Sequence, residues 1–130
     1  MKVKMNNSIN HIGLQVIDAD VHNFYVDILN FNHIRSFKLS KEEAKNIFGI
    51  NKDINILFGE CTEMNLELFI VDTVQKPSFG HVCFHSRRIA EMAEMANRNG
   101  YKIFYRGNQE NQTLFLSDSN YNVFEIKHFL

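Results

Sequence analysis

The strongest constraint on this chain is an internal repeat that carries chemistry. Each half has the order strand, helix, strand, strand, strand. His11 and His81 each stand 20 residues before the strand that follows the helix of their half. Each half then ends on a strand in which a glutamate, Glu67 or Glu125, lies between apolar residues. This pattern predicts two copies of one structural unit, with His and Glu at equivalent positions.

The periodicity of apolar residues places the elements of each copy. We expect strands at 10–17, 31–39, 54–58, 66–71, 79–85, 101–106, 113–116 and 123–129, and helices at 21–29 and 87–99. A further short helix is expected at 41–48, with Ser40 as its N-cap. The segment 72–78 contains the only proline, Pro77, and is the predicted linker. We therefore expect a single α+β domain over residues 1–130, built from two βαβββ modules at about 8–72 and 79–130.

Composition limits the classes of function. The chain is 45% hydrophobic, which indicates a globular domain, and its net charge of −1 with no basic stripe argues against a nucleic-acid partner. No apolar run approaches the roughly 18 residues of a membrane span. The N-terminal residues are polar, and the two cysteines, Cys61 and Cys83, have no metal-binding or redox spacing. We expect a cytoplasmic protein with reduced thiols.

Strand alternation decides which residues share a face with the first His and Glu. His11 shares its face with Gly13 and Gln15, opposite a row of aliphatic residues. Glu67 shares its face with Phe69 and likewise lies opposite aliphatic residues. If helices cover the apolar faces, the faces with His11 and Glu67 line a cavity.

The second half repeats this arrangement of faces. His81 shares its face with Cys83 and His85, and Glu125 shares its face with Lys127. The opposite faces of both strands are again apolar. We therefore expect four polar side chains, two imidazoles and two carboxylates, to converge in an open β-barrel-like cavity.

These four side chains, His11, Glu67, His81 and Glu125, suit one divalent metal ion per chain. Neutral imidazole supplies nitrogen donors, and carboxylate supplies oxygen and compensating charge. A five- or six-coordinate ion keeps one or two positions for water or substrate. A closed structural zinc site is the competing geometry, although it usually contains Cys. Two buried histidines and two solvent-facing glutamates with no metal are the alternative.

Several segments resemble the vicinal-oxygen-chelate superfamily, which includes glyoxalase I, extradiol dioxygenases, fosfomycin-resistance enzymes and bleomycin-resistance proteins. The matching segments are 10–16 (NHIGLQV), 23–29 (NFYVDIL), 66–68 (LEL), 80–84 (GHVCF) and 118–126 (DSNYNVFEI). The resemblance covers nearly the whole chain. It implies the glyoxalase-type fold, a pair of βαβββ modules that form an open barrel around a metal, commonly in a homodimer.

The resemblance also implies a ligand set. His11, Glu67, His81 and Glu125 match the metal-ligand pattern of glyoxalase I, whereas dioxygenases and fosfomycin enzymes use three protein ligands and lack the glutamate at the position of Glu67. Bleomycin-binding proteins usually lack the set. Gln15 stands where glyoxalase I often has an arginine for glutathione, so the substrate is expected to differ.

The expected function is that of a metal-dependent lyase or isomerase of glyoxalase I type, acting on a small substrate with adjacent oxygens. The metal, nickel, zinc, iron or manganese, stabilises an enediolate, and Glu67 or Glu125 takes the α-proton. The predicted pocket residues are Gln15, Phe69, Cys83 and His85. The alternatives are an epimerase similar to the methylmalonyl-CoA enzyme and a non-catalytic module that sequesters a small molecule.

Overall fold

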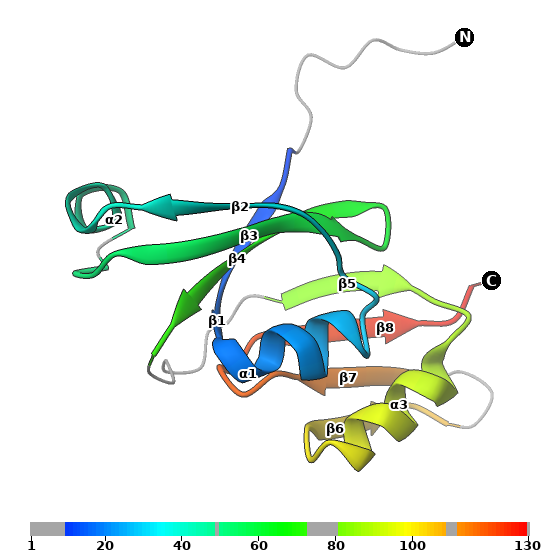
Figure 1. Cartoon of the computed structure of the whole chain (residues 1–130). Coiled ribbons are helices and arrows are strands. Elements are labelled where there is room, and N and C mark those ends of the chain that lie inside the picture. Colours follow the sequence, from blue (N-terminus) through cyan, green and yellow to red (C-terminus); the bar gives the residue numbers. More distant parts are fainter. Residues whose placement is uncertain (1–9, 49, 73–80, 109–111, 130) are drawn as a thin grey trace, which may run out of the picture.

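The computed structural model describes residues 10–48, 50–72, 81–108 and 112–129, and of His81 only the backbone. These residues form two four-stranded sheets, shown in Figure 1. Sheet A has the order β1-β4-β3-β2, from β1 (Ile12–Ile17), β2 (Asn32–Leu39), β3 (Ile54–Cys61) and β4 (Met64–Val71). Sheet B has the order β5-β8-β7-β6, from β5 (His81–His85), β6 (Lys102–Arg106), β7 (Thr113–Ser117) and β8 (Val123–Lys127). The predicted α+β fold of two βαβββ modules is confirmed. The predicted linker falls largely in 73–80, outside the described residues.

The register of the parallel strands confirms the internal repeat. In sheet A, β1 pairs with β4 in parallel, and Gly13 lies opposite Glu67. In sheet B, β5 pairs with β8 in parallel, and Cys83 lies opposite Glu125. The residue two positions after each histidine therefore faces the glutamate of its own half. Within each sheet the other pairings are antiparallel.

The first helix differs from the sequence prediction in its bounds and in its winding. It begins as α1 (Asp18–Asp20) and continues as η1 (Val21–Val26), a π-helix, so the predicted helix at 21–29 overlaps it but misses its start and its π-helical turn. The π-helical bond from the Asp27 N–H to the His22 carbonyl is 3.0 Å long. The side chains of Phe24 and Tyr25 in this turn are fully buried. Their packing is a tertiary effect, which helical periodicity does not encode.

The other two helices form where the sequence places them. Helix α2 (Lys41–Phe48) follows Ser40, whose Oγ accepts the Glu43 N–H at 3.2 Å and donates to the Glu43 carboxylate at 3.1 Å. This reciprocal pair is a capping box. Helix α3 (Ile89–Arg98) buries its apolar stripe, and Gly100 follows it at a φ of +78°.

One core joins the two modules. It takes aliphatic residues from sheet A, aliphatic and aromatic residues from sheet B, and the apolar sides of α1–η1 and α3. Phe24 and Tyr25 of η1 both contact the ring of Phe124 in β8, and α1 and α3 lie on the same side of sheet B in Figure 1. By alternation, Glu67 and Glu125 stand on the opposite faces of their sheets, away from this core.

A buried polar network reinforces the contact between the modules. The Tyr25 hydroxyl donates to Asp118 Oδ2 at 2.8 Å, and both residues are buried. The Tyr101 hydroxyl and the Ser119 N–H donate to the buried Asp20 at 2.6 and 2.7 Å. Because each carboxylate receives several donors, the cost of burying it is offset by hydrogen bonds.

A second, smaller core lies on the other face of sheet A. Helix α2 covers that face, where Ala44 packs with Ile54, Ile56, Phe69 and Val71. This is the face that carries Glu67, because Phe69 and Val71 follow Glu67 at intervals of two along β4. Helix α2 therefore bounds one end of the face on which the first pair of predicted ligands stands.

Candidate metal centre

Two of the four predicted ligands meet on sheet A. His11 precedes β1, and Glu67 lies on the neighbouring strand β4. The His11 Nε2 is 3.0 Å from Glu67 Oε1, and the two side chains are 37% and 12% exposed. The strand pairing alone holds them together, so this half of the site is preorganised by backbone hydrogen bonds.

The geometry of this pair fits a metal ion. The other ring nitrogen, His11 Nδ1, is 2.7 Å from Asn10 Oδ1, and an Nδ1–H that donates in this contact would make Nε2 the ligand atom for a bound metal. Two ligand atoms at about 2.1 Å from a metal, at right angles, are about 3 Å apart. The spacing of Nε2 and Oε1 therefore matches two adjacent ligands of one ion.

The second half of the predicted site lies on sheet B. The backbone of His81 opens β5 opposite Val123, and Glu125 stands two pairs further along, opposite Cys83. The Glu125 carboxylate is 18% exposed and lies 3.4 Å from Lys127 Nζ. The side chain of His81 lies outside the described residues, so its contact with Glu125 stays a prediction.

The two halves do not meet within the described part of the chain. No three His, Cys, Asp or Glu side chains among the described residues are close enough to hold one metal ion. Glu125 is therefore not part of the His11–Glu67 pair. The reason is the shared core, because both sheets turn their apolar faces toward it and carry the predicted ligands on their other faces.

The predicted pocket residues divide in the same way. Gln15 and Phe69 face each other in register on sheet A and line a cavity there. On sheet B, Cys83 is an exposed residue. Slight desolvation of its thiol, together with the nearby Glu125 carboxylate, raises the pKa of that thiol. His85 stacks on Phe129 with ring centroids 5.6 Å apart, which turns it toward the C-terminal segment.

Several residues around the site were not predicted. Asn10 contacts the His11 ring through its side-chain oxygen. The ring of Phe58 meets the His11 ring edge-on, with the ring centroids 6.2 Å apart. The guanidinium of Arg35 lies over the Phe58 ring, 4.3 Å from its centroid. The only feature of the sequence that could have indicated a role for Asn10 is its position next to His11. Phe58 could have been found from its place on the same face as Glu67, since the two are paired in register.

The chain was compared with families, curated proteins and solved structures. No family model matches it, and no curated protein matches it. None of the described helices has the length and apolar character that a membrane span requires.

Solved structures do match. A FosX fosfomycin-resistance protein from Listeria monocytogenes, an E-to-Q mutant complexed with Mn(II) and 1S,2S-dihydroxypropylphosphonic acid, has a TM-score of 0.72 and 19% identity, covering 97% of this chain and 95% of that one. FosX from Mesorhizobium loti has a TM-score of 0.68 and 13% identity, covering 97% and 94%. At these identities the likeness concerns the fold. Together with the strand order and the repeated register, it shows that this chain has a glyoxalase-type fold.

Proposed function

We propose that this protein is a metal-dependent lyase or isomerase of glyoxalase type that acts on a small substrate with adjacent oxygens. The observation that carries the proposal is the 3.0 Å contact between His11 and Glu67, together with the equivalent register of Glu125 on the second sheet. In each sheet the residue two positions after the histidine lies opposite the glutamate, so the backbone register of the two halves is equivalent.

The proposed ligands are His11, Glu67, His81 and Glu125, for one divalent ion per chain. When bound, the ion supplies Lewis acidity that stabilises negative charge developing on the substrate oxygens. Mn(II) in the Listeria FosX crystal supports a divalent ion, and nickel, zinc and iron fit the same donor set.

The protein contributes the base. A carboxylate, Glu67 or Glu125, takes the proton α to the carbonyl and returns it to the neighbouring carbon. Both glutamates are mostly buried on their sheet faces, so either one is shielded from competing water. His85 is a weaker candidate, because its ring stacks on Phe129.

A second copy of the chain completes the site. His11 and Glu67 of one protomer meet His81 and Glu125 of the other, and the protein is a homodimer. The support is that, among the described residues, Glu125 does not join His11 and Glu67 in one cluster. Sheet B and the segment that follows it also present two exposed apolar side chains, Phe104 and Phe129, which are 61% and 50% exposed.

Calorimetric titration with Mn(II), Ni(II) and Zn(II) tests the metal site. We expect saturable binding by the parent and large losses of affinity in His11→Ala and Glu125→Gln. His22→Ala is the matched control, because His22 is exposed and its contact is with Asp27. Equal affinities for His11→Ala, Glu125→Gln and the control would refute the ligand assignment.

Mixing the two variants tests the division between chains. In a mixed dimer of His11→Ala and Glu125→Gln, one site carries both changes and the other carries neither. Random exchange of protomers therefore restores up to about a quarter of the parental metal binding. If each site belonged to one chain, the mixture would recover nothing.

Exchange of the substrate α-proton with deuterated solvent tests the chemistry. NMR of the metal-loaded parent with oxoacids, hemithioacetals and acyl-CoA esters is expected to show exchange with one of these classes. Glu67→Gln or Glu125→Gln abolishes it, and His85→Ala leaves it. Binding of ligand with no exchange would instead support a sequestering module.

A second candidate is action on fosfomycin. It is supported by the FosX proteins of two bacteria, each of which matches 97% of this chain in structure. Phosphorus NMR of fosfomycin with the Mn(II)-loaded protein separates the candidates, since a new phosphonate signal appears only if the antibiotic is consumed.

A further inference from the structure

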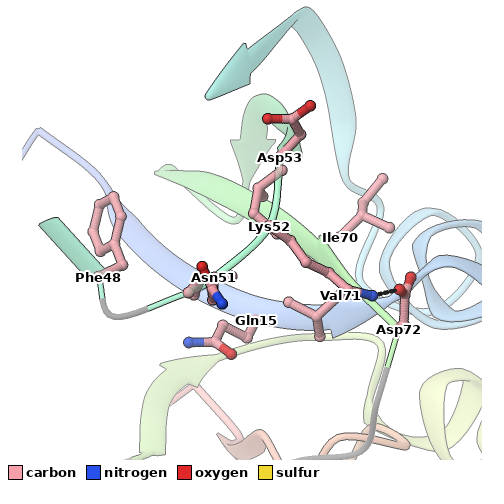
Figure 2. Close-up of a pocket in the computed structure, with 10 residues that line it drawn as sticks. Gln15, Phe48, Asn51, Lys52, Asp53, Ile70, Val71 and Asp72 are labelled. Carbon is pink, nitrogen blue, oxygen red and sulfur yellow. Dashed lines mark hydrogen bonds and ion pairs between the residues drawn. The ribbon is translucent and has the colours of Figure 1, made fainter. Parts of the chain in front are cut away.

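A cavity of about 470 Å³ lies at one end of the site face of sheet A. Its apolar walls come from Phe48 at the end of α2, from Ile54 and from Val71, and the loop at residues 50–53 closes one side (Figure 2). The volume is within the range of small-molecule sites, about 300–1,000 Å³.

Two side-chain amides extend into this cavity. Figure 2 shows the amides of Gln15 and Asn51 in the space bounded by Phe48 and Val71. Among the described residues, neither side-chain amide has a hydrogen-bond partner. The Gln15 backbone is firmly held, because its carbonyl accepts bonds from two side chains of the turn before β8. The cavity therefore offers donors and acceptors on a fixed strand.

The charges around the cavity cancel. The Lys52 side chain crosses to Asp72 and forms an ion pair with it (Figure 2). Asp53 accepts the N–H of Lys41 at 2.7 Å and lies 3.9 Å from Lys38 Nζ. Each cation is thus matched by a carboxylate, so an anionic ligand group gains no net attraction and still loses its hydration.

The cavity continues toward the proposed metal centre. A smaller space of about 90 Å³ joins Gln15 and Phe48 to Gly13 and Phe69. Gly13 lies between Gln15 and His11 on one face of β1, and the ring of Phe69 packs against it, 3.1 Å from the position that a Cβ would take. Gln15 stands four residues from His11, about 13 Å along an extended strand.

We infer that this cavity binds a neutral carboxamide group on an apolar stem. The Gln15 and Asn51 amides pair with the carboxamide, and Phe48, Ile54 and Val71 surround the stem. Resting on the function proposed above, the carboxamide is the far end of a substrate whose chelating oxygens reach His11 and Glu67. The substrate is accordingly an elongated molecule with an amide-bearing arm.

Matched fragments test the cavity without any metal. Hexanamide, hexanoate and hexylamine are titrated into isotope-labelled protein, and amide shifts are followed by NMR. We expect hexanamide to shift Asn51 and Val71 saturably, and hexanoate to bind about tenfold more weakly. Gln15→Met and Asn51→Leu abolish the hexanamide shifts, whereas Gln112→Met, the same change outside the cavity, keeps them. Equal or tighter binding of hexanoate, or shifts that survive both cavity variants, would overturn the assignment.

A second probe tests the connection to the metal centre. Octanohydroxamic acid with and without a terminal carboxamide is titrated into the Mn(II)-loaded protein. We expect the carboxamide to tighten binding about tenfold, and Gln15→Met to remove that gain. No gain would overturn the placement of the substrate arm. If neither hydroxamate bound while hexanamide still did, the metal proposal would fail and the cavity assignment would stand.

Discussion

Removal of one buried hydroxyl tests how the two modules are held together. Tyr25 of η1 donates to Asp118, which begins the turn before β8, so the bond crosses between the modules. Tyr25→Phe deletes this donor and keeps the ring, including its edge-on contacts with Phe24 and Phe124 at 5.0 and 5.9 Å. The substitution therefore isolates a hydrogen bond from packing.

The magnitude follows from what Asp118 retains. Its carboxylate still accepts the N–H groups of Asn120 and Asn122 and the Asn122 side-chain amide. Hydrogen bonds to charged groups contribute about 1.5–3 kcal/mol, and the remaining donors prevent an orphaned charge, so we expect a loss of about 2 kcal/mol. Tyr101→Phe is the matched comparison, because Tyr101 is only partly buried, and it is expected to lose about 1 kcal/mol.

The dependence on pH gives a second signature. Burial raises the pKa of Asp118 above its ordinary value, and the bond from Tyr25 lowers it. Removing Tyr25's hydroxyl raises this pKa further in the folded state. A folded-state pKa above the unfolded value means that stability falls as pH rises through it, so the loss in Tyr25→Phe is greater near pH 7 than near pH 4.5.

Urea unfolding followed by circular dichroism, at one protein concentration and both pH values, measures these losses. A loss below about 0.5 kcal/mol near neutral pH would refute the reasoning. So would a loss that is equal or larger in acid, because Asp118 would then not be the ionised acceptor.

Three further predictions follow from local geometry. In Gly59→Ala, the new Cβ would meet the backbone of β2 and a buried ring, so thermal unfolding should show a loss of stability of about 3 kcal/mol. In Gly13→Ala, the new Cβ meets only the edge of one ring at 3.1 Å, so the loss of stability should be about 1 kcal/mol or less. Ser40→Ala removes the capping box of α2 and should lower stability by about 1 kcal/mol, and a loss no greater than experimental error would show that the cap is not formed in solution. Asn10→Ala removes the hydrogen bond to the His11 ring and should weaken metal binding about tenfold in calorimetry. An unchanged dissociation constant for the metal would show that Asn10 does not orient the ring.

Strand alternation was enough to predict much of the candidate site. A period of two places His11 and Glu67 on faces opposite the aliphatic residues without knowledge of the tertiary structure. The internal repeat then predicts that Gly13 and Cys83 are equivalent, and both lie opposite a glutamate in the observed register. These are local properties of a strand, so they can be derived from the sequence.

The turn before β8 shows where local reasoning loses detail. Ser119 and Tyr121 lie in this turn, which contains neither proline nor glycine. Tyr121 adopts a φ of +66°, which a glycine would adopt without strain, and the Ser119 N–H donates to Asp20. The turn keeps its position because Asp118 accepts two backbone N–H groups from it. That compensation depends on contacts between modules, which no local pattern contains.

The cavity beside Gln15 was beyond sequence reasoning for a similar reason. Its walls come from α2, from the loop after it and from the end of β4, which are distant in sequence and individually unremarkable in pattern. Of the four predicted pocket residues, Gln15 alone lines this cavity. The chemistry of the cavity arises from which amides remain unpaired after folding, and pairing is a property of the tertiary structure.

The separation of the two half-sites links assembly to metal binding. Parallel strand pairing brings His11 and Glu67 together on sheet A, and among the described residues Glu125 of sheet B does not join them. Under the proposed dimer, an ion that binds both pairs binds the assembled state more tightly than the separate chains. By linkage, metal then favours the dimer by the same factor by which the dimer favours metal. The shared core therefore has two consequences: it stabilises the single chain, and it leaves Glu67 and Glu125 on the outer faces of their sheets, where under the proposed dimer a second chain would complete the site.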